Sequence, residues 1–281
     1  MTHIELFHGL VAAGMKIRYG HKPGKEAVLR VLWEKKHIMD AGFVDYYLMA
    51  FWIFHHYAKS AGIAFWTRGA MSSSIVSYCL GLTEVDPIKY CLHAARFVND
   101  ELPMFQFNIE APRYEEFLKG AEEVLQANAE EYDITAIKDC LFQDLTPMDY
   151  LSKKNERPLP ENLDDELARY ALYFPQTMDL YEAYVQNPST FNGLIYQEQM
   201  MDILRQTFHV SGIKANNIRL AIQREETEQV EAYRHELFAK LKDIALEEGE
   251  TVWQRLTSNP RAFLKAHAIS RVMAKYRFEF K

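Results

Sequence analysis

The spacing of apolar residues predicts helices along most of the chain, because side chains three or four residues apart share one helical face. Residues 25–40 are expected to bury Val28, Leu32 and either Ile38 or Met39 on such a face. Residues 45–58 are apolar almost throughout, which is typical of a helix enclosed by a core. The same periodicity predicts further helices over 72–80, 114–131, 196–208, 225–246 and 263–276.

Strand-like alternation is confined to the first half of the chain. Residues 62–66 form a short apolar run, and residues 104–110 alternate between apolar and polar side chains. Because alternate side chains of a strand share one face, three polar residues of the second run are expected to point the same way. They are Gln106, Asn108 and Glu110.

A charged, proline-containing segment divides this pattern into two parts. Residues 150–166 combine many charges with Pro158 and Pro160, which predicts a linker, and the pattern beyond it is helical almost to the end. We therefore expect a mostly helical α+β protein with a small sheet, organised as domains at 1–150 and 160–281.

The composition is that of an ordinary globular protein, with 48% apolar and 25% charged residues in a chain of 281. The net charge of −7 hides a segregation: residues 15–36 carry +5, residues 111–170 carry −8, and residues 262–281 carry +4. The basic ends either form a surface for an anionic ligand or are solvated helix faces. The overall acidity argues against a strong nonspecific nucleic-acid binder.

Cysteine content and hydropathy indicate a cytoplasmic protein. Cys79, Cys91 and Cys140 form no CxxC pair and cannot all pair with one another, which fits a reducing compartment. The most apolar stretch, residues 46–58, is shorter than the about 20 residues that a bilayer span needs, so no membrane partner is expected. No basic segment precedes the N-terminal apolar stretch, and we expect no signal peptide.

Common catalytic and cofactor motifs are absent from the sequence. No GxSxG, HExxH, Walker loop or GxGxxG occurs, so hydrolase, zincin and dinucleotide-binding functions lack support. His55 and His56 are adjacent on a predicted helix and point about 100° apart, so they cannot chelate one metal ion. No resident cofactor is expected.

Several motifs occur in an order that resembles the bacterial C-family replicative DNA polymerases, the DNA polymerase III alpha subunits. The segment TRGAMSSSIVSYCLGLTEVDP resembles the arginine-glycine-serine loop, serine-rich helix and DP turn of that family's palm. GLIYQEQMMDIL and FLKAHAISRVMAKYRFEF resemble two motifs of its fingers. The resemblance implies a truncated nucleotidyltransferase-like palm over 1–150, packed against a helical fingers-like region over 160–281. The family's other domains and its inserted thumb are expected to be missing.

The resemblance also implies that the metal site is degenerate. Family members use an Asp-x-Asp-x-Asp strand, whose first two aspartates hold the divalent metals for nucleotidyl transfer. Gln106 and Asn108 stand at those two positions, and neutral amides hold Mg²⁺ weakly. The remaining acids are Glu110 and Asp139, the latter in a segment that resembles the family's K.DFLGL strand.

A set of candidate phosphate-binding residues follows from the same resemblance, although the serine of the arginine-glycine-serine loop is replaced by Ala70. Three serines follow it, and they either compensate or pack a small-residue helix. The candidate nucleotide- or phosphate-binding residues are Arg68, Gly69, Ser72, Ser73, Ser74, Arg96, Arg219, Arg224, Lys265 and His267. Tyr196 is a candidate for base stacking, with core packing as the alternative.

Three functions remain open from the sequence. We favour a catalytically degenerate relative of the DNA polymerase III alpha subunit that binds DNA or a dNTP weakly, or docks onto a replication or repair protein. The second is an active DNA-directed nucleotidyltransferase that holds Mg²⁺ on Glu110 and Asp139. The third is a purely structural interaction module without affinity for nucleic acid. The oligomeric state is not predicted.

Overall fold

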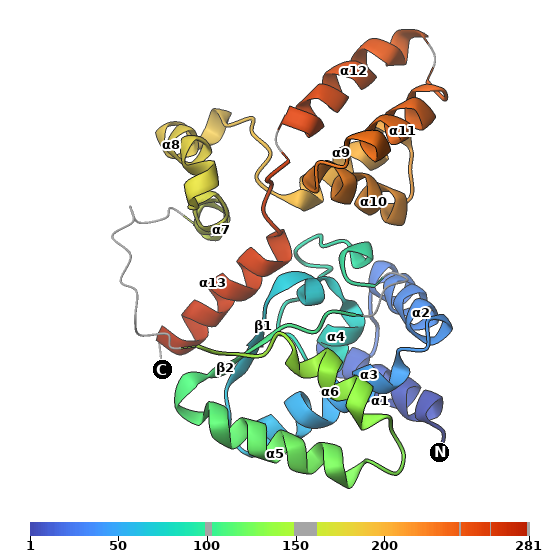
Figure 1. The fold of residues 1–281 in the computed structure, drawn as a ribbon, viewed down its shortest axis with the longest axis vertical. Coiled ribbons are helices and arrows are strands. Elements are labelled where there is room, and N and C mark those ends of the chain that lie inside the picture. The colour runs from blue at the N-terminus through green and yellow to red at the C-terminus, as the bar shows by residue number, and fades with distance from the viewer. Residues whose placement is uncertain (99–102, 149–161, 242, 259, 280–281) are drawn as a thin grey trace. The chain divides into compact units, whose positions relative to one another are not determined.

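A computed structural model describes residues 1–98, 103–148, 162–241, 243–258 and 260–279 (Figure 1). The chain divides into two compact units, of which the first comprises Met1–Glu156 with Ile269–Lys281 and the second Arg157–Ala268. The domain boundaries at 1–150 and 160–281 stay a prediction. The structure differs from them in grouping residues 269–281 with the first unit.

The first unit combines helices with a small sheet. Its helices are α1 (His3–Tyr19), α2 (Lys25–Asp40), α3 (Val44–Ala50), α4 (Ile75–Cys79), α5 (Tyr114–Ala127) and α6 (Ile134–Phe142). Its strands are β1 (Phe65–Thr67), β2 (Phe107–Glu110) and β3 (Thr146–Met148). A π-helix continues α3 over Phe51–Ala58, and short 3₁₀ turns lie at Gly69–Ser73, Ala94–Arg96 and Ala111–Arg113.

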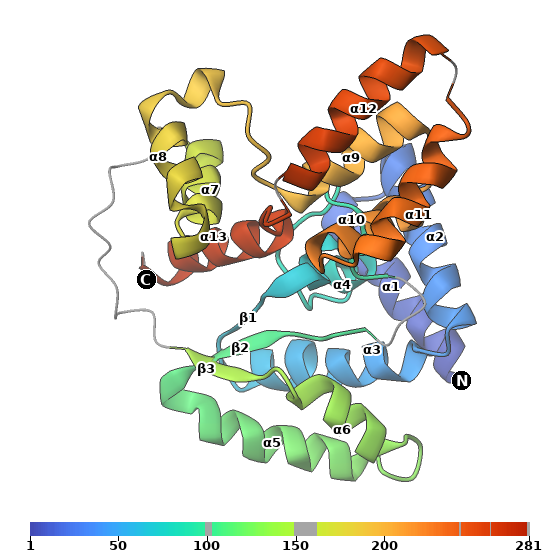
Figure 2. The ribbon, with the colours of Figure 1, turned by 45° about the horizontal axis from the view of Figure 1, so that its top comes forward.

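The three strands form one mixed sheet in the order β1-β2-β3. β1 runs antiparallel to β2, and β3 runs parallel to β2. Asn108 at the centre of the sheet is in register with Trp66 on one side and with Thr146 on the other. Figure 2 shows α3, α5 and α6 on the same side of this sheet.

Aromatic packing holds the apolar face of the sheet against the helices. The ring of Phe107 in β2 stacks on Phe54 of the π-helix with centroids 3.6 Å apart. Phe54 also lies 5.4 Å from Phe117 of α5 and 5.6 Å from Phe65 of β1. This core leaves the alternate side chains, among them Gln106 and Asn108, on the other face of the sheet.

Helix α2 has the predicted bounds but buries a different face. Leu32, predicted to be buried, is 56% exposed, and Val28 is only half-buried. The residues that α2 buries are Ala27, Val31, Glu34 and Ile38, of which only Ile38 was predicted. The prediction was wrong because a buried carboxylate, Glu34, fixes the rotation of the helix, and apolar periodicity carries no information about such a contact.

Among its described residues, the second unit contains helices, turns and one isolated parallel β-bridge between Tyr196 and Phe263. Its α-helices are α7 (Leu163–Leu172), α8 (Met178–Gln186), α9 (Gln197–Phe208), α10 (Gly212–Gln223), α11 (Thr227–Phe238) and α12 (Asp243–Ser258). Short 3₁₀ turns occupy Pro175–Thr177 and Pro188–Thr190. The last helix, α13 (Lys265–Glu279), has residues in both units.

The single helix predicted over 225–246 is wrong, because α11 ends at Phe238 and α12 begins at Asp243. The reversal lets Trp253 of α12 pack edge-on against Phe208 and Phe238, with ring centroids 6.3 Å away in both cases. Burying these large rings stabilises the two shorter helices over one continuous helix.

The fold class predicted from the sequence is confirmed: the protein is mostly helical, with one small sheet among the described residues. Within that same part of the chain, no helix combines the length and the apolar character needed to span a membrane.

Candidate functional site

The candidate site lies on the polar face of the sheet, around the residue that precedes β2. The amide nitrogen Nε2 of Gln106 donates a hydrogen bond to Asp144 Oδ2 at 3.1 Å. Arg68 donates through Nη2 to the Asp144 carbonyl at 2.6 Å and lies 3.4 Å from Oδ1 of the same carboxylate. The backbone N–H of Arg68 also donates to the Gln106 carbonyl at 3.0 Å. One guanidinium, one amide and one carboxylate therefore form a closed group.

Asn108 is the next polar residue on this face, and it is only 2% exposed. Its side-chain oxygen accepts a hydrogen bond from the hydroxyl of Thr146 at 2.5 Å, across the register pair between β2 and β3. The oxygen that would have to contact a metal ion is therefore already in use within the sheet.

The two acids picked out from the sequence lie elsewhere. Glu110 Oε1 accepts the backbone N–H of Ala64 at 2.7 Å, at the end of the β1–β2 pairing. Asp139 is an exposed residue of α6, so the expectation that its segment forms a strand was wrong. Asp133 starts this helix by accepting the backbone N–H of Ala136 on its side chain, a local capping signal that the family-like strand motif obscured.

Asp144 is the carboxylate that sequence reasoning missed. It lies in the turn between α6 and β3, and β3 is the parallel neighbour of β2. The sequence did contain a signal for this residue, because an acid two residues before a short strand lies at the edge of the sheet. Its partner could be found only from the pairing of two strands 38 residues apart.

The loop after Arg68 requires glycine at position 69. Gly69 has a φ of +64°, which disfavours residues with a Cβ atom. A Cβ built there would lie 1.7 Å from Oε1 of Gln106, which is far inside van der Waals contact. Glycine at position 69 is therefore needed to bring this loop against Gln106, which precedes β2.

The serines that follow the loop are completely buried, with 0% exposure for Ser72, Ser73 and Ser74. Ser72 shares a hydrogen-bonded cluster with the hydroxyls of Thr67 and Thr83, at 2.8 and 3.0 Å. Their environment matches the packing alternative, since each faces the interior of the first unit.

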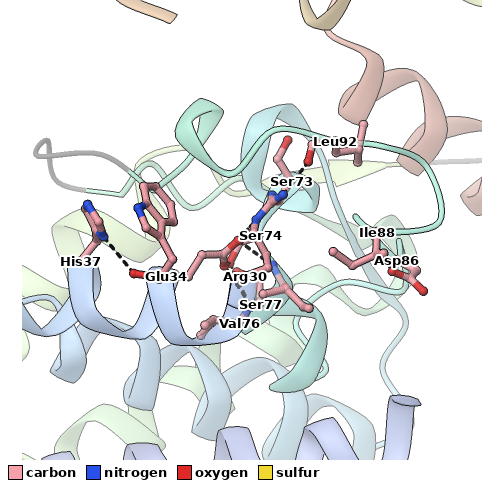
Figure 3. A network of polar contacts seen from close by, with 12 residues as sticks. Arg30, Glu34, His37, Ser73, Ser74, Val76, Ser77, Asp86, Ile88 and Leu92 are labelled. Carbon is pink, nitrogen blue, oxygen red and sulfur yellow. Dashed lines mark hydrogen bonds and ion pairs between the residues drawn. The ribbon is translucent and has the colours of Figure 1, made fainter. Parts of the chain in front are cut away.

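The start of α4 is closed by a carboxylate from α2 (Figure 3). Glu34 is 0% exposed and accepts from the Ser74 hydroxyl at 2.8 Å. It also accepts the backbone N–H groups of Ile75 and Val76, at 3.2 and 3.1 Å. These are the groups that a phosphate would use at a helix N-terminus, so an internal anion already occupies them.

Arg30 pairs with this buried carboxylate and ties two loops to α2 (Figure 3). Its Nε donates to Glu34 Oε1 at 2.7 Å. Its Nη2 and Nη1 donate to the carbonyls of Ser73 and Leu92, at 2.6 and 2.9 Å. The Leu92 loop leads into the 3₁₀ turn Ala94–Arg96, so the network holds the segment that carries the half-buried candidate Arg96.

In the second unit, the two candidate arginines of α10 differ in exposure. Arg219 is 1% exposed and donates to the side-chain oxygen of Asn216 at 3.1 and 3.2 Å, and to Gln197 Oε1 at 3.2 Å. Arg224 is exposed at the end of α10 and lies 3.8 Å from Glu226. Only Arg224 of these two presents its charge to solvent.

Lys265 and His267 lie at the start of α13. The buried carboxylate of Glu198 accepts the Lys265 backbone N–H at 2.9 Å. The Lys265 ammonium lies 5.8 Å from the ring centre of Tyr196, and His267 packs edge-on against Phe263. Tyr196 is 9% exposed, and burial raises the pKa of its hydroxyl, so packing describes this ring better than base stacking.

The structure thus brings together only Arg68, Gly69 and Gln106 of the predicted site residues in the first unit, with Asp144 added. No group of three or more His, Cys, Asp and Glu side chains within the described ranges is arranged to hold a metal ion.

Comparison with protein families follows this division of the chain. Residues 5–129 match the family model of the bacterial DNA polymerase III alpha NTPase domain. Residues 151–245 match that of the bacterial DNA polymerase III alpha subunit finger domain. The chain belongs to the family of bacterial DNA polymerase III alpha subunits. The palm-like and fingers-like motifs of the sequence fall within or beside these two matches.

Curated relatives in this polymerase family align with the chain over part of its length. The error-prone DNA polymerase of Anaeromyxobacter sp. (strain K) is 31% identical over 122 residues, covering 42% of this chain and 11% of that protein. The DNA polymerase III subunit alpha of Halalkalibacterium halodurans is 36% identical over 123 residues, with the same coverage. That of Staphylococcus aureus (strain MRSA252) is 37% identical over 98 residues, 34% of this chain and 9% of that protein. The matched part of the chain thus spans about a tenth of the length of these relatives.

Proposed function

We propose that this chain is a catalytically inactive member of the DNA polymerase III alpha family that acts by binding DNA. The relatives that it resembles are DNA polymerases by name, which supports DNA as the ligand class. The loss of catalysis is supported by the hydrogen bonds of two polar side chains, one just before β2 and one within it. Its two amides, Gln106 and Asn108, are engaged by Asp144 and Thr146.

The electrostatic argument concerns the charge needed to hold two divalent ions. Nucleotidyl transfer uses two metals about 3.5–4 Å apart, bound by anionic oxygens. Here a single carboxylate, Asp144, lies beside Gln106, and Arg68 pairs with it. The local charge of the three side chains is close to zero, whereas metal binding requires a strongly negative site.

The candidate phosphate-binding residues support the same view. Ser72, Ser73 and Ser74 are buried, Arg219 is buried among amide oxygens, and Glu34 occupies the start of α4. An incoming triphosphate would have to compete with these internal partners. We therefore expect weak binding of free dNTPs compared with DNA.

Primer extension tests the inactive state directly. Purified protein is mixed with a labelled primer–template, all four dNTPs and either Mg²⁺ or Mn²⁺, and no extended product is expected. Asp144→Asn and Glu110→Gln serve as variants. Extension by the wild type that either variant abolishes would show an active site and overturn the proposal.

DNA binding is tested by fluorescence polarisation across a salt series. For duplex DNA, each phosphate contact contributes a slope of about −0.9 in log affinity against log salt. Arg224→Gln removes an exposed charge and is expected to reduce this slope by about 1, whereas Lys119→Gln on the exposed face of α5 is the control. Absence of salt-dependent binding would favour the alternative, a protein-interaction module without affinity for nucleic acid.

A further inference from the structure

The outward side of α2 carries leucines and lysines in a regular stripe. Four residues recur there at helical spacing: Lys25, Leu29, Leu32 and Lys36. They lie opposite the buried residues of the helix. Leu29 and Leu32 are each 56% exposed, and a lysine flanks the pair at either end. We refer to these four residues as the α2 stripe.

Exposed apolar side chains are concentrated in this part of the molecule. Of the eight large hydrophobic side chains exposed among the described residues, five belong to the first 32 residues: Met1, Ile4, Ile17, Leu29 and Leu32. Single exposed leucines are ordinary, but two on one stripe of one helix form a surface that association can bury. Leu29 and Leu32 lie one turn apart, which is the spacing that a second helix contacts.

The charge around the stripe is basic in an acidic chain. Residues 15–36 carry +5, whereas the whole chain carries −7. Lys16, Lys22 and Lys25 are exposed, and no ion pair is observed for them within the described part of the chain. Lys36 pairs with Asp40 on the same helix. Charges of this kind attract an acidic partner while the rest of the chain repels it.

We propose that the α2 stripe docks an acidic amphipathic helix of a partner protein. The partner's apolar side chains contact Leu29 and Leu32, and its carboxylates pair with Lys25 and Lys36 at the two ends. These lysines are eleven residues apart, so a partner helix of about three turns matches the stripe at 1.5 Å per residue. The leucines distinguish this surface from one that follows a phosphate backbone.

This inference goes beyond the proposed function, because neither DNA binding nor loss of catalysis is needed for it. An active polymerase with the same α2 would carry the same surface. The full chain is therefore suitable for the test, and DNA binding measured in parallel keeps the two proposals separate.

The probe is a fluorescein-labelled synthetic peptide of about 18 residues, since shorter helices are marginal in water. It carries leucines at i, i+3 and i+7 and glutamates at the flanking positions. A second peptide keeps the leucines and replaces every glutamate with lysine. Polarisation titrations with the full chain are expected to show binding of the acidic peptide and at least tenfold weaker binding of the basic one, since the basic peptide meets like charges.

Variants on the stripe are compared with variants of the same chemistry elsewhere. The double variant Leu29→Ser, Leu32→Ser is expected to bind the acidic peptide about tenfold more weakly, because the burial of two half-exposed leucines is lost. Lys25→Glu is expected to weaken binding of the acidic peptide about fivefold, and this loss of affinity should diminish at high salt. Leu163→Ser and Lys119→Glu change exposed residues on α7 and α5 and serve as controls. All five substitutions are at exposed positions, so folding is checked by unchanged thermal unfolding.

Several results would overturn the proposal. One is equal binding of the two peptides, and another is stripe variants that behave like their controls. If the wild type self-associates in sedimentation and the double leucine variant does not, the occupant is a second copy of this chain instead. If Lys25→Glu abolishes duplex DNA binding while the leucine variant leaves peptide binding unchanged, the stripe belongs to a DNA surface. Loss of binding to phosphatidylglycerol vesicles in the leucine variant would assign it to a membrane.

Discussion

Two helix starts in this protein are closed by the chain's own carboxylates. Glu34 accepts backbone N–H groups at the start of α4, and Glu198 accepts them at the start of α13. Helix N-termini attract anions because their first N–H groups have no intrahelical partner. A buried glutamate satisfies these groups permanently, so a phosphate at either position would first have to displace it.

Replacing Glu34 with glutamine tests how much the first unit depends on this carboxylate. The variant leaves Arg30 partly buried without its counter-charge, and breaking such a pair costs about 3–5 kcal/mol. We expect the free energy of unfolding in urea to fall by about that amount. Glu26→Gln changes an exposed residue of the same helix and should remain within about 0.5 kcal/mol of the wild type. Equal effects of the two substitutions would mean that the buried network contributes little.

The amides of the candidate site allow a second test at the residue scale. The double variant Gln106→Asp, Asn108→Asp adds two carboxylates to a face that already holds Asp144. Repulsion between them should lower Tm, and a divalent ion that binds only the folded state should restore it. We therefore expect millimolar Mn²⁺, enough to occupy a site as weak as about 1 mM, to raise Tm of the double variant and not that of the wild type. A similar Mn²⁺ response of the wild type would indicate a native metal site and contradict the electrostatic argument.

At the scale of elements, the loop between β1 and α4 depends on Gly69. Gly69→Ala places a Cβ 1.7 Å from Gln106 Oε1 at a positive φ, so either the loop or the Gln106–Asp144 contact must move. We expect a loss of about 2 kcal/mol or more in urea unfolding.

Gly9→Ala provides the matched control for this prediction. Gly9 lies within α1, and a Cβ there would meet no atom within 4 Å. The same substitution should therefore stabilise the protein by up to about 1 kcal/mol through helix propensity. If the two glycine substitutions change the free energy of unfolding in opposite directions, the effect at Gly69 comes from its local contacts and not from replacing glycine in general. A neutral Gly69→Ala would show that the loop does not need this close approach.

The sequence predicted the positions of most elements but not how they are oriented. Apolar periodicity located α2 and α9, yet it assigned Leu32 rather than Val31 to the core of the first unit. Residues 1–20 were not predicted as a helix, although Thr2 and Glu5 form the capping box at the start of α1. Rotation of a helix and reversals such as that before α12 depend on tertiary contacts, which local patterns do not contain.

The sequence predicted the types of residue in the candidate site better than it predicted which of them lie close together. Alternation correctly placed Gln106 and Asn108 on one face, because the strand period is fixed by the backbone. The acid opposite Gln106 is Asp144 instead of Asp139, because α6 extends through the segment that resembled a strand. Which residues approach one another across a sheet is decided by strand register, and that register is set by packing far from the motif itself.

At the scale of the whole molecule, the two compact units correspond in part to the two family matches. The first match lies within the first unit, and most of the second match lies within the second unit.

All three cysteines belong to the first unit, and Trp253 packs in the second. Burial raises the pKa of Cys79 to about 12 and that of Cys140 to about 11, whereas Cys91 is exposed. Thiol labelling therefore reports on the first unit alone.

This arrangement predicts that the units unfold as separate cooperative blocks, with Cys79 and Cys140 reacting only when the first one opens. At pH 8 both thiols are protonated and buried, so Ellman's reagent should label one thiol of three quickly, and the other two at the rate of opening. Trp253→Ala removes a large buried ring and should destabilise the second unit by about 3–5 kcal/mol. The thermal transition of the second unit should shift to lower temperature, while the slow labelling of Cys79 and Cys140 keeps its wild-type rate. Helix α13 has residues in both units, so the same measurement tests whether it couples their unfolding. If Trp253→Ala accelerates labelling of Cys79 and Cys140 by the same free energy as it destabilises the second unit, the chain is one cooperative block, and the function of either unit has to be tested in the presence of the other.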